Sequence, residues 1–386
     1  MPSIIFLLGA ASFIVVAVMT VTGPLLPLLA GEFGVSVGRA GLIVTAFAVP
    51  YGAFQILFGP LGDRYGKLRV MSAALAAASV CTLACGWVAT LNGLISARAS
   101  CGVAMAGTVP LAMAWIADEV PYAKRQLVIG RYINGLVLGQ IAGGSLGGIA
   151  AEYFDWRHIF YLFAAGAALI AACLARQAWR VGAPVHVPVA SHPAAVLATY
   201  GALLRVRRSR DIIIVGTLEG GLVFGVLTYF GAFLRHTYAL DYATIGLALG
   251  CYGLGGLIYS ALVYRLVPLL GERRMIVIGT MLLGGCYLVM PLVAIWWWLL
   301  PLFGVAGFGF YTFHNTVQTQ ATEMSVAARG TALSLWVFMM FAGQGLGVVL
   351  FGLAVDQVGY ARAFVAGGCA VIALGLWCQH RMRSWH

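Results

Sequence analysis

The stretch Gly59-Pro-Leu-Gly-Asp-Arg-Tyr-Gly-Lys-Leu-Arg69 is a polar, charge-dense segment between two long apolar runs. Residues 38–58 before it and 70–91 after it are each about twenty largely uncharged residues, the length that an α-helix needs to cross a bilayer. We therefore predict a tight loop between two membrane-spanning helices. Its cations outnumber its single acid, Asp63, so the positive-inside tendency places this loop in the cytoplasm.

The composition of the whole chain agrees with this prediction. Of the 386 residues, 62% are hydrophobic and only 9% are charged, whereas a soluble domain carries roughly a quarter of charged residues. The apolar runs are continuous, whereas the strands of a membrane β-barrel would alternate over about ten residues. We therefore predict an all-α membrane protein.

The net charge of +11 reflects membrane topology rather than nucleic-acid binding. When the chain is divided into twelve alternating spans, most Lys and Arg residues fall on one side, which makes that side and both termini cytoplasmic. The short loops favour a bacterial cytoplasmic (inner) membrane. The eight cysteines lie in apolar runs and have no spacing typical of a zinc site or a disulfide framework. We expect no metal and no cofactor.

The opening stretch resembles motif A of the major facilitator superfamily, G-x-L-x-D-R-x-G-R-K-x-R, which lies between helices 2 and 3 of that family. The matching residues are Gly59, Leu61, Asp63, Arg64, Gly66 and Arg69. Lys67 is cationic where the pattern has Arg, and Leu68 is apolar where it has Lys. The resemblance implies a transporter.

Glycines recur every four residues in the predicted fifth helix, about residues 128–150. They form a groove that lets a neighbouring helix pack backbone to backbone. The groove consists of Gly139, Gly143, Gly147 and Gly148. It resembles motif C, G-x-x-x-G-P-x-x-G-G, which is typical of exporters in the superfamily, although Gly144 replaces the proline. The alternative is that these glycines serve only close helix packing, since any close-packed helix pair could use them.

Arg98 lies near the start of the predicted fourth helix and shares a face with Gly102 and Ala106. This spacing resembles motif B, R-x-x-x-G, whose arginine is associated with proton coupling. The alternative is an arginine that snorkels to the outer membrane interface.

The two halves of the chain repeat each other when it is shifted by 204 residues. The superposed pairs include Glu119 and Glu323, Arg125 and Arg329, Gly139 and Gly343, and Gln140 and Gln344. We predict two pseudo-symmetric six-helix halves, residues 1–178 and 212–386, joined by a cytoplasmic linker, 179–211. These twelve transmembrane helices resemble the superfamily fold, which implies a binding cavity between the halves near the midplane.

Glu219 is the one acid near the middle of a predicted membrane helix; the other acids lie in loops or near helix ends. A carboxyl group at that depth costs several kcal/mol unless it is protonated or paired. Proton exchangers of the superfamily often use such a membrane-embedded carboxylate. We therefore expect Glu219 to carry protons, with Arg98 and His314 as further members of the coupling machinery. A structural Glu bonded to a neighbouring helix is the alternative.

Tyr311, His314 and Gln318 share one face of the predicted tenth helix, with Asn315 beside them. A polar stripe of that length is unfavourable toward lipid, so we expect it to face the cavity and bind substrate. His314 is then a substrate partner or a titrating group, and a packing role stays open. Trp336 and other aromatic residues of the second half suit an apolar or aromatic substrate, with lipid-facing filler as the alternative.

Charged residues at the predicted cytoplasmic helix ends look like a gate. The gate comprises Gly59, Asp63, Arg64, Gly66 and Arg69 together with the pairs Glu119/Arg125 and Glu323/Arg329. We expect these charges to clamp the halves shut in the outward-facing state and to separate when the protein opens inward.

We therefore expect a secondary transporter that works by alternating access and exports small amphipathic or apolar compounds in exchange for protons. Its partners would be a small-molecule substrate, protons and membrane lipid but no nucleic acid, and we expect a monomer. The alternative within transporters is an importer or uniporter of a small metabolite or organic anion, contacted by Arg98. A membrane enzyme would need a clustered His, Asp or Cys constellation, and a sensor would need a sizeable soluble domain; the sequence suggests neither.

Overall fold

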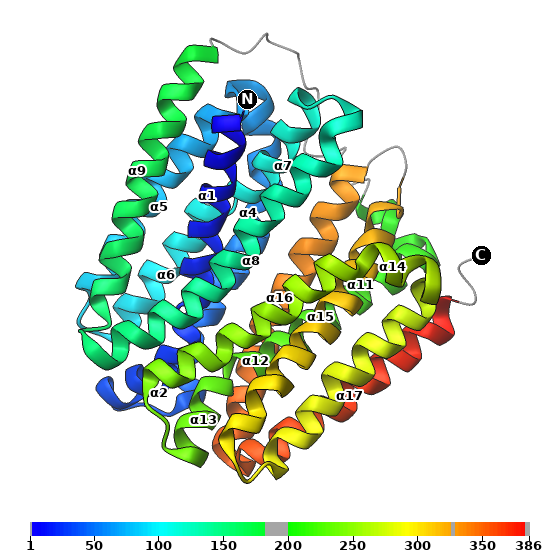
Figure 1. The fold of residues 1–386 in the computed structure, drawn as a ribbon. Helices are drawn as coiled ribbons and strands as arrows, with labels where there is room; N and C mark the ends of the chain where they lie inside the picture. Colours follow the sequence, from blue (N-terminus) through cyan, green and yellow to red (C-terminus); the bar gives the residue numbers. More distant parts are fainter. Residues whose placement is uncertain (1, 182–199, 326–328, 383–386) are drawn as a thin grey trace.

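The computed structural model describes residues 2–181, 200–325 and 329–382, without the side chains at 2–3, 122–127, 131, 181, 329 and 330. Every element in these ranges is a helix (Figure 1). Ten helices are long and apolar enough to cross a membrane. One of them, Tyr242–Leu292, makes two crossings because the chain turns back at Gly271, and α15 (Leu299–Thr322) adds another. The protein is thus an all-helical membrane protein with about twelve crossing helices.

The N-terminal part of the chain forms one group of helices, coloured blue to green in Figure 1. They are α1 (Pro2–Thr20), α2 (Thr22–Glu32), α3 (Val37–Ala40), α4 (Leu42–Tyr65), α5 (Lys67–Trp87), α6 (Leu91–Met105), α7 (Thr108–Glu119), α8 (Tyr122–Tyr153) and α9 (Arg157–Val181). α1 and α2 form one crossing that is broken at Val21, and α6 and α7 form another.

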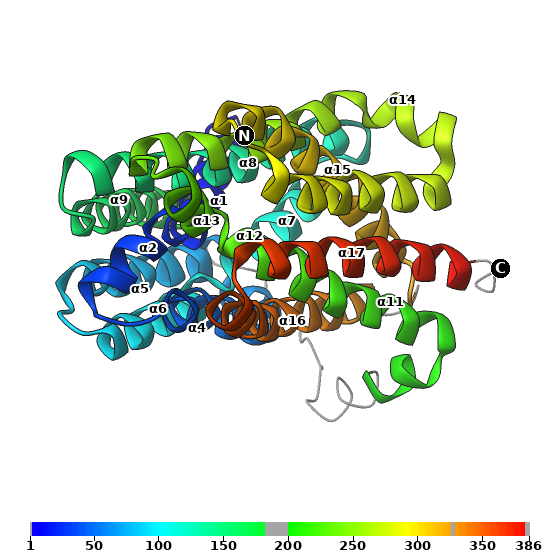
Figure 2. The same cartoon turned by 90° about the horizontal axis from the view of Figure 1, so that it is seen from below.

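The C-terminal part forms a second group, which lies beside the first in both views (Figures 1 and 2). It contains α11 (Arg207–Glu219), the π-helical turn η1 (Gly220–Phe224), α12 (Gly225–Thr228), α13 (Phe230–Tyr238), α14 (Tyr242–Val289), the 3₁₀ turns η2 (Met290–Leu292) and η3 (Trp296–Trp298), α15, α16 (Arg329–Val358) and α17 (Tyr360–Met382).

The predicted linker, 179–211, lies partly outside the described residues, at 182–199. Its described ends are helical, because α9 continues to Val181 and α11 begins at Arg207. The division of the chain at this segment stays a prediction.

The stretch predicted as a loop is mostly helical. α4 continues to Tyr65 and α5 begins at Lys67, so the prediction of a loop over the whole stretch was wrong. The reversal needs only Gly66, whose φ of 91° and ψ of 127° lie in a region that glycine adopts at little cost. Gly62, at a variable position of the motif, lies so close to α7 that a Cβ atom there would collide with the end of the Leu111 side chain.

Glycines bring α8 against α1 and, equivalently, α16 against α11. A Cβ atom at Gly139 would lie 2.5 Å from the carbonyl oxygen of Phe13, and one at Gly343 would collide with that of Thr217. One turn further on, Gly143 lies against Ala17 and Gly347 against Gly221, and Gly147 then meets Val21. Corresponding contacts in the two halves are 204 residues apart, so the repeat in the sequence is also a repeat of packing.

The two halves are joined at the end of the bundle that holds Gly359, here called the Gly359 end; the opposite end, which holds Gly66, is the Gly66 end. At the Gly359 end, Glu152 accepts a hydrogen bond from the backbone N–H of Tyr242 (2.8 Å). Asp356 likewise accepts one from the backbone N–H of Gly38 (3.2 Å). Glu152 and Asp356 are 204 residues apart, and so are Gly38 and Tyr242. The two contacts are therefore pseudo-symmetric.

Gly148 and Gly352 make these contacts possible. A Cβ atom at Gly148 would collide with the carbonyl oxygen of Tyr242, and one at Gly352 would lie 2.8 Å from the Cα atom of Gly38. Helix α8 therefore packs on α14, and α16 packs on α3 and α4, across the boundary between the halves. These two seams hold the Gly359 end closed.

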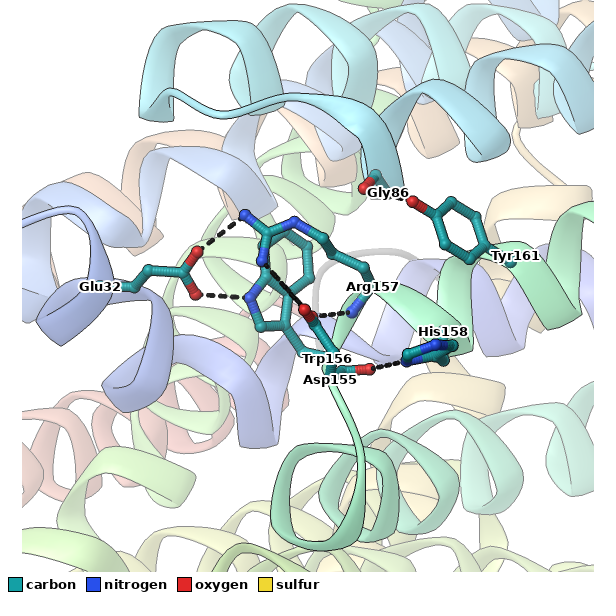
Figure 3. Close-up of polar contacts among 7 residues, drawn as sticks. All are labelled: Glu32, Gly86, Asp155, Trp156, Arg157, His158 and Tyr161. Atoms are coloured by element: carbon teal, nitrogen blue, oxygen red, sulfur yellow. Dashed lines mark hydrogen bonds and ion pairs between the residues drawn. The ribbon is translucent and has the colours of Figure 1, made fainter.

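A polar network stiffens the first half at the same end (Figure 3). Glu32, at the end of α2, accepts hydrogen bonds from the Arg157 guanidinium (2.8 Å) and from the Trp156 indole N–H (2.5 Å). Arg157 also binds Asp155. The network ties the first crossing to the turn between α8 and α9.

A test of the glycine seam is the change Gly347→Ala. Its added methyl group would overlap the backbone of Gly221, so we expect a loss of roughly 1–3 kcal/mol of stability. The measurement is the apparent melting temperature of the purified protein in detergent, followed by size-exclusion chromatography.

The matched control is Gly285→Ala, because a Cβ atom at this helical position has no neighbour within 4 Å. Alanine favours a helix over glycine by about 1 kcal/mol, so the control should keep or slightly raise the melting temperature. Equal melting temperatures for the two variants would contradict the close approach at Gly347.

Candidate functional site

A cavity of about 810 Å³ lies between the two halves. Residues of α1, α2, α4 and α8 line it from one side, and residues of α14, α15 and α16 from the other. Gln55, Glu272 and Thr319 extend its wall toward the Gly66 end. The contacts of Glu152 and Asp356 lie at the closed Gly359 end, so this conformation opens toward the Gly66 end.

Glu219 ends α11, where the helix widens into the π-helical turn η1. Its side chain is 0% exposed. The next residue, Gly220, lies so close to α16 that a Cβ atom would collide with the carbonyl oxygen of Met340. Single π-helical turns are rare and occur frequently at functional sites, so the local backbone also marks this position.

His314 pairs with Glu219 and connects α15 to α11. Its Nδ1 lies 2.8 Å from one carboxylate oxygen, Oε1 of Glu219. The His314 side chain is 15% exposed and lies on the cavity wall, whereas Glu219 is behind it. The structure therefore brings together two residues that the sequence marked as candidates for proton coupling.

Aromatic rings enclose the His314 imidazole. Phe310 stacks on it with a centroid distance of 5.1 Å, and Trp336 lies 5.7 Å away. Trp336 lies on the cavity wall and is shielded from bulk solvent, so it is not lipid-facing filler. The pair thus lies in apolar surroundings, which strengthen any electrostatic interaction between its members.

The polar stripe of α15 faces the cavity as predicted. Tyr311, His314, Asn315 and Gln318 all lie on its wall. The Tyr311 hydroxyl donates a hydrogen bond to Oε1 of Gln140 on α8 (2.5 Å), which connects the two halves inside the cavity. A role of these residues in substrate binding stays a prediction.

Several polar wall residues were not singled out as site residues from the sequence, among them Gln140, Tyr252, Glu272 and Gln344. Gln140 and Gln344 coincide in the internal repeat, a signal that was available for both. Glu272 follows the turn at Gly271, and its carboxylate accepts a hydrogen bond from the Gln320 side chain. Tyr252 left no signal, because one tyrosine in an apolar helix is unremarkable.

Arg98 lies in the core of the first half, away from the cavity wall. It is 0% exposed, so it does not snorkel to an interface. Its guanidinium donates hydrogen bonds to the carbonyl oxygens of Val18 (2.7 Å) and Met19 (3.4 Å) and lies over the Phe47 ring. The structure does not bring Arg98 to Glu219 or His314, and a coupling role for it stays a prediction.

The motif at the Gly66 end forms an ion-pair network within the first half. Lys67 Nζ lies 3.2 Å from Asp63 and 2.5 Å from Asp118. Asp118, the residue before Glu119, is therefore the α7 acid that binds this lysine. The guanidinium of Arg64 lies over the ring of Tyr65.

The side chains that the structure describes do not establish a contact between the two halves at the other predicted gate residues. The side chains of Arg125 and Arg329 lie outside the described part of the chain. Glu119 is exposed, Arg69 and Glu323 have contacts of their own, and Gly59 has no neighbour near its missing Cβ. The gate across the two halves stays a prediction.

Relatives of this chain are transporters by name. The chain is 28% identical to the "Uncharacterized MFS-type transporter YceJ" of Bacillus subtilis over 380 residues, which covers 96% of this chain and 92% of that one. A partial match, 27% identical over 155 residues, joins 40% of the chain to 30% of the "Multidrug export protein EmrB" of Escherichia coli.

The fold and a family profile agree with these matches. A solved structure described as a POT family transporter in complex with a thioalcohol-conjugated peptide superposes with a TM-score of 0.81 at 14% identity, covering 99% of this chain and 96% of that one. The profile described as Major Facilitator Superfamily matches residues 8–325 and 212–385. The chain belongs to the Major Facilitator Superfamily, and it is therefore a multi-pass membrane transporter of small molecules rather than an enzyme.

Proposed function

We propose that the protein is a proton-coupled exporter of small amphipathic or apolar compounds. The observation that carries this proposal is the buried pair of Glu219 and His314 beside the cavity. The partial match to the multidrug export protein supports the export direction, although it covers only 40% of this chain.

The pair has the properties that a proton carrier needs. A carboxylate sealed from water costs several kcal/mol unless it is protonated or compensated by a cation. Glu219 meets this condition when it holds a proton or when His314 holds one. Loss of that proton leaves one net negative charge beside the cavity. Because the substrate would bind in the same cavity, the protonation of the pair changes the charge that the substrate meets.

His314 is the route by which protons reach Glu219. Its imidazole lies on the cavity wall, and the carboxyl group of Glu219 lies behind it. A proton taken up from the cavity water therefore passes through the imidazole before it reaches the carboxylate. This arrangement separates the carboxyl group from bulk water while keeping it in exchange with the cavity.

Alternating access assigns a side of the membrane to each end of the bundle. The positive-inside tendency makes the Gly66 end cytoplasmic, with both termini there, in a bacterial inner membrane. The cavity then faces the cytoplasm, and the Gly359 end must open to release substrate. The halves 1–178 and 212–386 rock as two bodies about the cavity, joined by the linker and acting as a monomer.

The geometry favours this proposal over import of an organic anion. An anion carrier needs a cation on the cavity wall, and Arg98 lies elsewhere with its guanidinium bound to backbone carbonyls. Among the described wall residues there is no Lys or Arg.

Proton movement in everted membrane vesicles tests the proposal. Vesicles are energised, and a panel of cationic, neutral and anionic compounds is added while the internal pH is followed by a fluorescent dye. We expect a subset of compounds to release protons in the wild type and to release none above background in Glu219→Gln. His314→Ala should have the same effect because it removes the route to the carboxyl group.

The control is Glu32→Gln, which makes the same acid-to-amide change far from the cavity and should keep proton release. Release that persists in Glu219→Gln would show that this carboxyl group does not couple transport to protons. A silent panel in vesicles that hold a stable proton gradient would remove the exporter proposal.

A second prediction concerns the closed end. Asp356→Ala removes the acceptor of the Gly38 N–H and of the Ser36 hydroxyl, which lie in the other half. Both hydrogen bonds are exposed to solvent, and each contributes about 0.5–1.5 kcal/mol, so the outward-open population should rise by roughly tenfold. Spin labels at Arg39 and Ala361 would report this as growth of a longer distance in pulsed electron resonance.

The control for this measurement is Asp155→Ala, which removes an acid at the same end whose partner, Arg157, lies in the same half. It should leave the distance distribution unchanged. An unchanged distribution in Asp356→Ala would show that this contact does not hold the end closed.

A further inference from the structure

Five buried polar atoms beside the cavity have no hydrogen-bond partner among the described residues. One is the Thr22 hydroxyl in the first half; the other four, in the second half, are the Tyr252 hydroxyl, Nε1 of Trp336, Oε1 of Gln344 and Oε2 of Glu219. Each side chain is at least nine-tenths buried. Buried polar atoms without partners are costly and uncommon, so a group of them at one cavity indicates a polar ligand.

The four atoms form one cluster in the second half. Gly216 lies against Trp336, since a Cβ atom there would collide with the indole nitrogen. Gly220, one turn further along, lies against the backbone of Gln344. Glu219 is between these glycines in the chain, so it lies on the part of α11 that packs against α16.

Tyr252 closes the cluster from α14. Its ring lies 5.8 Å from that of Phe310, which in turn stacks on His314. The Tyr252 side chain lies within electrostatic range of Glu219. Tyr252, Trp336, Gln344 and His314 all lie on the cavity wall, so a molecule in the cavity lies beside them.

The charges around the cluster select for cations. Glu272 is the one acid on the described cavity wall, Glu219 lies just behind it, and no Lys or Arg is on it. Arg208 is linked to Glu272 through the side chain of Gln320, which accepts a hydrogen bond from the guanidinium and donates one to the carboxylate. Faces of Trp336 and Phe310 add the attraction that aromatic rings have for organic cations.

We propose that this cluster binds the protonated nitrogen of amphipathic organic amines. The amine donates a hydrogen bond to Oε1 of Gln344, and the negative charge of deprotonated Glu219 attracts it. The apolar body of the molecule lies against the aromatic residues. Trp336 and Tyr252 remain as donors for a ligand oxygen. This assignment of a substrate class rests on the transport function proposed above.

The experiment measures binding of four matched compounds to the purified full-length protein in nanodiscs by equilibrium dialysis, with empty nanodiscs subtracted. The compounds share one naphthyl body: naphthylmethylamine, its trimethylammonium analogue, naphthylmethanol and naphthoate. They differ in charge and in N–H donors. We expect the amine to bind at least about tenfold more tightly than the alcohol and the trimethylammonium compound, and naphthoate not to bind.

Variants of Gln344 separate hydrogen bonding from charge. Gln344→Met keeps the side-chain volume and removes the acceptor, so it should weaken the amine about tenfold and leave the trimethylammonium compound unchanged. Gln344→Glu adds a negative charge, so it should strengthen both cations. Thr322→Val is the control, because its hydroxyl lies off the cavity wall and is bound to the backbone of Thr319, so all four affinities should stay the same.

Equal binding of the amine and the alcohol, or tightest binding of naphthoate, would overturn the proposal. A Gln344→Met effect of the same size on both cations would do so too. Failure of the transport proposal can be distinguished from failure of this inference. Cation selectivity in nanodiscs without proton release in vesicles would refute proton coupling but would still support the amine-binding site. Proton release by other compounds without cation selectivity refutes this inference alone.

Discussion

The close approach of helix backbones at glycine is the constraint on which this structure depends. Helices in lipid gain little from hydrophobic contact with one another, so their association relies on tight van der Waals packing. Gly139 against Phe13 and Gly343 against Thr217 provide that packing in the two halves. The packing of α16 on α11 also places Glu219 beside α16, because Glu219 lies between Gly216 and Gly220 in the chain. The position of the buried carboxyl group thus follows from the packing of its helix.

The same repeat explains how the halves close against each other. Glu152 and Asp356 each accept a hydrogen bond from the first turn of a helix in the opposite half. Helix N-termini carry unsatisfied N–H groups and a partial positive charge, which favours a carboxylate there. Because the two contacts are pseudo-symmetric, they lie on either side of the seam and close it evenly. Contacts of this kind break without exposing apolar surface, which suits an end that must open and close.

Much of the fold was predictable from the sequence because its signals are local or repeated. Apolar length identifies crossing helices, and the shift of 204 residues relates Gly139 to Gly343 without any structure. Glu219 and His314 stood out because charged and titratable groups are costly in a membrane helix. Their contact was not predictable, since it depends on how α11 and α15 are rotated toward each other.

Other parts of the site left weaker signals for physical reasons. Tyr252 and Gln344 are neutral, and in an apolar helix they disturb the hydropathy very little. Contacts between the halves, such as Asp356 with Gly38, depend on how two rigid bodies dock, and no periodicity encodes this. The extent of α4 was mispredicted because polar residues at the end of a membrane helix look like a loop, although Gly66 alone makes the turn.

Carbonyl oxygens at equivalent helix breaks of the two halves accept hydrogen bonds from different side chains, Arg98 in the first half and Tyr287 in the second. The break after α1 leaves carbonyl oxygens in the last turn without helical partners, and Arg98 donates to those of Val18 and Met19. In the second half the equivalent of Met19 is Val223, within the π-helical turn, and its carbonyl oxygen accepts a hydrogen bond from the Tyr287 hydroxyl (3.4 Å). The carbonyl oxygens at the break therefore accept hydrogen bonds from a cation in one half and from a neutral hydroxyl in the other. The second half therefore holds its buried acid, Glu219, without a fixed cation at the equivalent break. That acid is left to pair with His314, a side chain of a neighbouring helix on the cavity wall.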